Sequence, residues 1–230
     1  MAESSMKRLQ PAILGAALAL SLAVALLAGL VYVAGTNADW MHAMLTHHAP
    51  SDMTGLPEDE YYPMAEMITS YLAGARDTFQ HEFYRDGTGY ICFAQHEQQH
   101  MADCRALFAL CRWVLIVSGA LSAVLAYAAH RQRRNLRFLL IGRLTGLSVL
   151  LLAMAALVIW GTADFDGLFI LFHQLSFAND LWMLNPATDL LIRLMPTGFF
   201  VSYAAIIGGV WLAACAAVAV RTAVLVYRLR

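Results

Sequence analysis

Charged residues are scarce in this chain: 13% of its 230 residues are Asp, Glu, Lys or Arg, whereas 60% are hydrophobic. Such a composition is typical of a membrane protein. Cysteine is scarce as well, with four residues in all. Cys215 lies within an apolar run, and only Cys92 and Cys104 could plausibly meet outside the membrane. The cysteines therefore predict neither a disulfide framework nor a metal-binding spacing.

Four apolar windows are long enough to cross a bilayer, which takes roughly 20 residues. They cover residues 11–34, 107–129, 138–160 and 197–220. The first exceeds the roughly 7–15 apolar residues of a cleaved signal peptide, so we interpret it as a retained anchor. The windows hold almost no ionisable groups, which argues against a transporter. We expect an all-α membrane protein with four transmembrane helices and a single membrane domain over residues 1–230.

Acidic residues are absent from most of the chain. Every one except Glu3 falls within residues 35–106 or 161–196. Ten of the fifteen Lys and Arg residues gather near the other ends of the predicted spans: Lys7, Arg8, Arg131, Arg133, Arg134, Arg137, Arg143, Arg221, Arg228 and Arg230. The positive-inside rule then places both termini in the cytoplasm. The two acidic connections face outward and are expected to form a partly structured extracytoplasmic cap.

The first outer region, residues 35–106, contains several predicted elements. Prolines and a glycine predict a loop over 47–60, and an apolar period predicts a helix over 63–83. A turn signal at 86–89 precedes a short strand-like segment at 90–93. From Gln95 onward the pattern is helical again and can run straight into the second span.

This entry helix contains the sequence H-E-x-x-H at residues 96–100. One hypothesis is an outward-facing zinc protease, in which His96 and His100 bind the metal and Glu97 is the general base. That site requires a third protein ligand, which His173 or Asp189 could supply. The motif fixes only three positions in a histidine-rich region, so the zinc protease is kept as an alternative function.

The second outer region includes residues 164–200, a stretch too polar to span a bilayer and too apolar for a solvated loop. It is typical of a segment at the membrane surface. His173 lies within its most apolar run, and His100 adjoins the same membrane boundary from the other connection. Asp103 follows His100 by three residues on one helix face, where it could orient an imidazole.

Other polar and aromatic residues of this stretch have structural interpretations. Asp189 and Arg193 are four residues apart on a predicted short helix, where an ion pair is expected. Trp182 and the pair Phe199–Phe200 are interpreted as interface anchors rather than substrate contacts.

Three segments together carry a resemblance to a known family. They are E-x-x-H-M-x-D at 97–103, D-x-x-x-x-x-x-H-x-x-x-F-x-N-D-L-W at 166–182 and L-x-P-x-x-D-L-L-I-R-L-x-P-x-x-F-F at 184–200. In these segments, and in span number and loop sizes, the chain resembles the lipoprotein intramolecular transacylases (Lit), which are bacterial four-span membrane enzymes. Cys104 and Ser176 depart from the expected pattern, and neither is expected to touch the chemistry.

The resemblance implies an acyltransferase of the bacterial plasma membrane with its active site at the outer leaflet. The sn-2 acyl chain of a lipoprotein's S-diacylglyceryl cysteine would move to the α-amine of that cysteine, giving a lyso-form lipoprotein. The implied catalytic residues are His100 and His173. From the residue chemistry, Asp103 is a candidate to orient an imidazole, and Asn179 and Arg193 could either add hydrogen bonds or hold the loop in place. No cofactor and no metal are implied. The implied partners are a diacylated lipoprotein N-terminus and membrane lipid, not nucleic acid.

The chemistry of the two histidines agrees with this reaction. An α-amine has a pKa of about 7.7–8.0, and a histidine with a pKa of about 6.5 is well placed to accept its proton. One of His100 and His173 would be the base and the other an acid or oxyanion donor, and the sequence leaves their roles open. A non-catalytic membrane scaffold is the remaining alternative.

Overall fold

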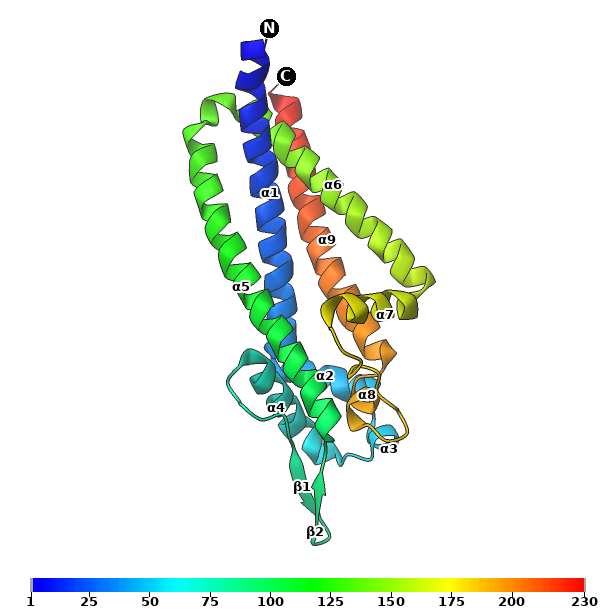
Figure 1. The fold of residues 1–230 in the computed structure, drawn as a ribbon. Coiled ribbons are helices and arrows are strands. Elements are labelled where there is room, and N and C mark those ends of the chain that lie inside the picture. The colour runs from blue at the N-terminus through cyan, green and yellow to red at the C-terminus, as the bar shows by residue number, and fades with distance from the viewer. Residues whose placement is uncertain (1, 230) are drawn as a thin grey trace. The chain divides into compact units, whose positions relative to one another are not determined.

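A computed structural model of the chain describes residues 2–229 and is mostly helical (Figure 1). Within these residues, four helices are long and apolar enough to cross a membrane: α1 (Ala2–Thr36), α5 (Gln95–Arg131), α6 (Leu136–Ala163) and α9 (Thr197–Arg228). Each contains one of the four windows expected from hydropathy. The prediction of an all-α protein with four spans is therefore confirmed.

Contacts along the backbone divide the chain into two compact units. Unit 1 combines Met1–Leu30, Trp113–Ala163 and Ile207–Arg230. Unit 2 combines Val31–Arg112 and Asp164–Ile206.

In unit 1, helices α1 and α6 pack through glycines. Gly142 and Gly146 form a G-x-x-x-G pattern in α6. A Cβ atom on Gly142 would collide with the carbonyl oxygen of Ala12, and one on Gly15 would collide with that of Leu139. The two backbones can therefore approach as closely as they do where small residues line a helix interface in a membrane.

Polar side chains of unit 1 bond between helices. The Ser21 hydroxyl of α1 donates to the Ser118 carbonyl of α5 (2.8 Å) and lies 2.8 Å from the Ser122 hydroxyl. The Trp211 indole N–H of α9 donates to the Ala23 carbonyl of α1 (2.7 Å). In apolar surroundings these bonds satisfy groups that would otherwise be costly to bury.

Unit 2 begins with four helical pieces: α2 (Ala38–His48), α3 (Ser51–Thr54), the 3-10 turn η1 (Glu58–Glu60) and α4 (Tyr61–Ala73). The expectation of a loop over 47–60 is wrong in part, since α3 and η1 lie within it. Pro50 directly precedes α3, and Gly55, with φ 75°, ends it. Proline and glycine here mark the start and the end of a helical turn instead of preventing one.

The helix predicted over 63–83 is also too long. Gly74 adopts φ 81°, and its N–H donates to the carbonyls of Ser70 and Tyr71, which ends α4 at Ala73. Such a left-handed terminal residue is a common helix stop, and glycine adopts it without a steric penalty.

A short hairpin follows, formed by β1 (Glu82–Arg85) and β2 (Thr88–Ile91). Its two-residue turn is Asp86–Gly87, with φ of 51° and 77°. Asp-Gly favours this primed turn, whose twist matches that of the strands. The predicted turn is confirmed, and the strand after it begins two residues earlier than expected. Helix α5 then starts at Gln95 as predicted.

The second connection forms α7 (Phe165–Ser176), an irregular segment over 177–189 and α8 (Leu190–Leu194). The core of unit 2 joins this connection to the first one. Its buried side chains come from both connections and from the start of α9, and they include Met41, Leu45, Met64, Ile68, Phe79, Phe93, Leu190, Leu194 and Phe199. Phe199 is 3% exposed, so its interpretation as an interface anchor is wrong.

Candidate active site

Unit 2 contains a pair of buried histidines. His100 of α5 and His173 of α7 are each 7% exposed. Their ring centroids lie 6.1 Å apart, with 31° between the ring planes. The two residues come from different connections, so only the tertiary fold of unit 2 brings them together.

Local signals on α7 place His173. The Asp164 side chain caps the helix by accepting the Gly167 N–H (2.8 Å). At the other end, the Phe177 N–H donates to the His173 carbonyl (2.9 Å) and ends the helix. Aspartate is among the preferred N-cap residues, and Asp166 in the first turn is also favoured there.

Aromatic rings enclose the pair. Phe177 contacts both imidazoles, with centroid distances of 5.2 Å to His100 and 5.5 Å to His173. Phe169 and Trp182 lie 4.1 Å and 5.0 Å from the His173 ring. Trp182, which we had interpreted as an interface anchor, therefore packs on a candidate catalytic residue. These rings exclude water and strengthen electrostatic interactions inside the site.

One hydrogen bond fixes the tautomer of neutral His173. Its Nδ1 lies 2.7 Å from the Phe169 carbonyl oxygen. A carbonyl can only accept, so Nδ1 carries the hydrogen, and the lone pair of the neutral ring lies on Nε2. Burial lowers the pKa of His173 below its ordinary value, and the bond to Phe169 offsets part of that effect. His173 is therefore neutral around pH 7 and presents a basic nitrogen.

His100 has the complementary feature, a ring nitrogen without a partner. Its Nδ1 is buried and has no hydrogen-bond partner in the part of the chain that the structure describes. Its Nε2 lies 3.6 Å from the Cys104 sulfur. Cys104, which we did not expect near the chemistry, thus contacts a candidate catalytic residue. The spacing of four residues on one helix was the signal that could have revealed this contact.

Asp103 does not take the position we expected. Its carboxylate accepts a hydrogen bond from the Asn179 side-chain amide (2.9 Å), not from His100. The Asn179 side-chain oxygen in turn accepts the Leu181 N–H (3.1 Å). The two supporting residues thus tie α5 to the segment that carries Phe177 and Trp182.

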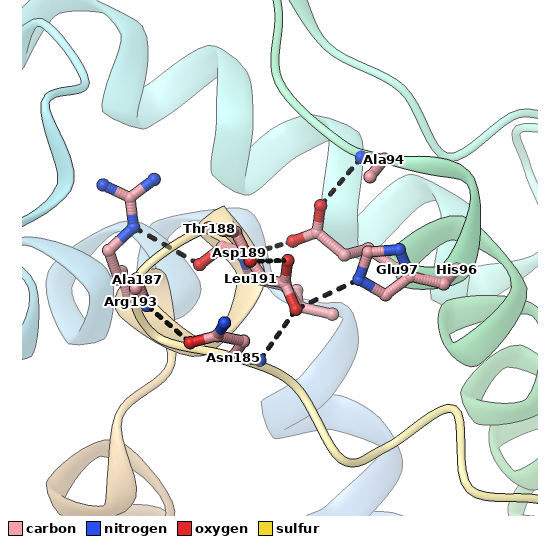
Figure 2. A network of polar contacts seen from close by, with 9 residues as sticks. All are labelled: Ala94, His96, Glu97, Asn185, Ala187, Thr188, Asp189, Leu191 and Arg193. Atoms are coloured by element: carbon pink, nitrogen blue, oxygen red, sulfur yellow. Dashed lines mark hydrogen bonds and ion pairs between the residues drawn. The ribbon is translucent and has the colours of Figure 1, made fainter.

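A second polar network joins the first turn of α5 to α8 (Figure 2). Glu97 is 1% exposed, and its two oxygens accept the backbone N–H groups of Ala94 (2.7 Å) and Leu191 (2.8 Å). His96 Nε2 lies 3.0 Å from a carboxylate oxygen of Asp189. Two residues of α5, His96 and Glu97, therefore hold the start of α8 one turn away from His100.

Asp189 and Arg193 do not form the expected ion pair. Besides His96, the Asp189 carboxylate bonds the Asn185 N–H (2.8 Å) and the Thr188 hydroxyl (2.8 Å). The Arg193 guanidinium instead donates to the backbone carbonyl of Asp189 (3.3 Å; Figure 2) and to that of Thr54 (3.3 Å). Arg193 therefore joins α8 to the end of α3 and lies in this network, not at the histidine pair.

The same network lowers the pKa of Asp189. Burial by itself raises the pKa of this carboxyl, but the hydrogen bonds from His96, Asn185 and Thr188 together outweigh burial, so the pKa falls below its ordinary value. Asp189 is a firmly ionised acceptor.

His96, Glu97 and Asp189 can offer ligand atoms within 4.8 Å of one another, so these are the residues that could hold a metal ion. This set contains only one histidine of the H-E-x-x-H sequence. His100, the other one, faces His173. Both Glu97 oxygens are occupied by backbone N–H groups. Glu97 is thus a buried acceptor for the backbone, which does not suit the general base of a zinc protease.

Comparison with known proteins agrees with this architecture. The profile of the lipoprotein intramolecular transacylase Lit family matches residues 16–200. A solved structure of the membrane-integral lipoprotein intramolecular transacylase Lit from Bacillus cereus is similar in fold, with a TM-score of 0.74 and 17% identity over 98% of this chain and 97% of that chain. A second structure of that protein, with one histidine replaced by arginine, gives a TM-score of 0.66 and 19% identity over 99% and 95% of the two chains.

A search of the curated proteins gives no match. The family profile nevertheless covers most of the chain, including both histidines and the segments around them. The resemblance seen in the sequence is confirmed: this membrane-integral chain belongs to the lipoprotein intramolecular transacylase (Lit) family of acyltransferases.

Proposed function

We propose that this protein transfers the sn-2 acyl chain of a lipoprotein's S-diacylglyceryl cysteine to the α-amine of the same cysteine. The α-nitrogen attacks the ester carbon and loses a proton, and the bond between that carbon and the glycerol oxygen breaks. The glycerol oxygen takes up a proton. The products are an amide and a free hydroxyl on one lyso-form lipoprotein, with no external acyl donor or acceptor.

The observation that carries this proposal is the pair of buried imidazoles enclosed by aromatic rings. Nucleophile and ester are on the same substrate molecule, so correct positioning can supply up to about 7–11 kcal/mol of the barrier reduction. Beyond positioning, the reaction needs a base, a donor for the developing oxyanion and little water. His100, His173 and the surrounding rings can supply all three without a covalent intermediate.

His173 takes the role of base in this mechanism. The Phe169 carbonyl holds its Nδ1–H, which leaves the Nε2 lone pair to accept the proton of the attacking amine. The same bond stabilises the imidazolium that forms. The proton is then available for the departing glycerol oxygen.

His100 takes the role of donor. Its buried Nδ1 has no partner among the described residues, so a substrate oxygen is a suitable partner for an Nδ1–H group. The Cys104 thiol beside Nε2 can donate its hydrogen to that nitrogen, which places the ring hydrogen of neutral His100 on Nδ1. A hydrogen bond that strengthens as charge develops on the oxygen favours the transition state.

Apolar side chains exposed on α7 and on the loop that follows it suit a substrate with acyl chains. Phe172 and Leu175 of α7 are 52% and 78% exposed, and Met183 is 61% exposed. Such exposed apolar groups on a short helix and its following loop suit contact with a membrane surface. We place this face at the outer leaflet of the plasma membrane, since the positive-inside rule puts both termini in the cytoplasm.

Tandem mass spectrometry of a lipoprotein N-terminal peptide tests the reaction. Substrate and product are isomers of equal mass, so fragment ions must show whether the acyl chain is on glycerol or nitrogen. Cells that express the chain should give the N-acyl form, and cells without it should give only the diacylglyceryl form. An unchanged acyl position at verified expression would disprove the proposal.

Reporter fusions test the orientation separately. A reporter after Arg230 should be cytoplasmic, and one inserted near Ser51 should be extracytoplasmic. The reverse pair of signals would move the histidine pair to the inner leaflet and overturn its proposed location.

A further inference from the structure

Unit 1 contains neither histidine of the candidate active site, and its charge is strongly one-sided. By sequence, its only acidic residue is Glu3. Its basic residues are Lys7, Arg8, Arg131, Arg133, Arg134, Arg137, Arg143, Arg221, Arg228 and Arg230. The cations of this unit therefore have few counter-charges within the unit itself.

A narrow apolar groove of about 110 Å³ lies between α1, α6 and α9 within this unit. Its small or aliphatic lining residues include Ala23, Leu147 and Cys215, which are buried, and Leu22 and Leu26, which are more exposed. One charged residue, Arg143, also lines it. A hydrocarbon chain fits such a lining, and an aqueous solute does not.

Arg143 is half-buried and has no hydrogen bond or ion pair with the described residues. It is seven residues into α6, which at about 1.5 Å per residue is about 10 Å along the helix. Arg221 lies seven residues before the end of α9. Each arginine is therefore the same number of residues from the end of its own helix. The electrostatic effect of Arg221 on Arg143 is repulsive.

An unpaired cation at this depth is costly in a membrane, and the repulsion from Arg221 raises the cost. An anion that bonds the Arg143 guanidinium in the groove would remove the cost, because arginine holds phosphate oxygens with two parallel N–H groups. An anion that also carries a hydrocarbon chain would fill the apolar groove at the same time.

We propose that this groove is a binding site for an anionic phospholipid of the leaflet that faces the chain termini. The phosphate bonds Arg143, which lines the groove, and one acyl chain lies along the groove between α1, α6 and α9. The bound lipid is distinct from the acyl substrate, since the groove belongs to the unit without the histidine pair.

Native mass spectrometry of the purified full chain tests this site, with phosphatidylglycerol and phosphatidylcholine of equal chain length as probes. Wild type should retain phosphatidylglycerol preferentially. Arg143→Ala should weaken that retention about fivefold or more, since it removes the charge-assisted hydrogen bonds to the phosphate, whereas Arg134→Ala should leave it unchanged. Arg134→Ala is the matched control, because Arg134 is exposed beside the same unit's helices and does not line the groove.

A second variant guards against misfolding of Arg143→Ala. Leu22→Trp keeps both arginines but fills the groove from its exposed edge, so it should also weaken phosphatidylglycerol retention. Circular dichroism of each variant checks that the helices are intact. Equal retention of the two lipids by wild type, or wild-type retention in both folded variants, would overturn the proposal.

Discussion

The two units of this molecule hold their helices together in different ways. Unit 1 uses glycines that let α1 and α6 approach closely, with interhelical bonds from Ser21 and Trp211. Unit 2 uses buried carboxylates, and Glu97 and Asp189 accept backbone N–H groups of the segment around α8. The contrast follows from backbone regularity: a helix satisfies its own N–H groups, whereas an irregular segment needs side-chain acceptors.

The same comparison bears on the proposed chemistry. Unit 2 contains His100, His173 and every supporting residue expected from the sequence, whereas unit 1 contains one histidine by sequence, His130 at the end of α5. The predictions below test the proposed catalytic role of the histidine pair in unit 2 and the contacts that stabilise each unit.

The largest effect is expected from the histidine pair. His100→Ala and His173→Ala should each lower acyl transfer by about 10²–10⁴-fold, as general acid–base groups do. The double variant should lose less than the product of the two, because residues that act together are not additive. The measurement is single-turnover acyl transfer to the amine, followed by tandem mass spectrometry. His42→Ala is the control, since His42 belongs to unit 2 and packs on Tyr62 instead.

His173→Gln separates the two proposed roles. Glutamine keeps a hydrogen-bond donor but cannot accept the amine's proton, so activity should be as low as in His173→Ala. Substantial residual transfer by this variant would assign His173 the donor role and contradict the base assignment.

The next effect is the pH dependence of transfer. The base must be neutral, and burial lowers the pKa of His173, so its protonation begins only below the ordinary histidine value. The attacking amine, with a pKa of about 7.7–8.0, must be neutral as well, so the acidic side of the kcat profile should show two steps, and the step due to the base should have its midpoint below about pH 6.5. Loss of that second step in His173→Gln, with the amine step retained, would support the assignment, and a second step that persists in His173→Gln would contradict it. His42→Ala should leave both steps unchanged.

Glu97→Gln should destabilise unit 2 by about 1–3 kcal/mol. The amide can accept only one of the two backbone N–H groups and turns its NH₂ group toward the other, which leaves a buried donor unsatisfied. Thermal unfolding in detergent measures the effect, and Glu66→Gln, at an exposed position, should be neutral. An unchanged melting temperature would refute Glu97 as a buried structural acceptor.

Unit 1 should be sensitive to a single methyl group. In Gly142→Ala, the new Cβ meets backbone atoms of Ala12, which cannot move like a side chain, so stability should fall by about 1–3 kcal/mol. Gly119→Ala is the matched control: it also lies inside a spanning helix, but its Cβ would have no neighbour within 4 Å. This substitution should be neutral or stabilising, because alanine favours helix. Equal effects of the two variants would argue against close packing of α1 and α6.

The smallest effect is expected from His96→Ala. His96 is 44% exposed on its side chain and supports Asp189 through one hydrogen bond. Acyl transfer should stay within a few-fold of wild type, as is usual for a lost bond of about 0.5–1.5 kcal/mol. A chelator should change little. Bound zinc in stoichiometric amount, lost together with activity in this variant, would favour the metalloprotein hypothesis instead.

The sequence by itself determined the membrane architecture. A membrane span is a continuous run of apolar residues, so the four spans can be identified from hydropathy without knowledge of any tertiary contact. Stop signals are equally local, and Gly74 at the end of α4 and Asp86–Gly87 in the hairpin act through their own backbone angles. The prediction of a helix over 63–83 is wrong because the apolar period continues past Gly74, and Gly74 ends the helix.

Only the tertiary structure decided how the functional residues are partnered. Glu97 binds the N–H of Leu191, 94 residues away, and Asp103 binds Asn179, 76 residues away. No local period encodes such pairs, since they depend on how an irregular segment folds back onto a helix. The same holds for the approach of His100 to His173: the sequence marks both as candidates, but only the folded chain brings their rings to 6.1 Å. The partner of one nitrogen on each ring is local, since Phe169 and Cys104 each lie four residues away on the same helix.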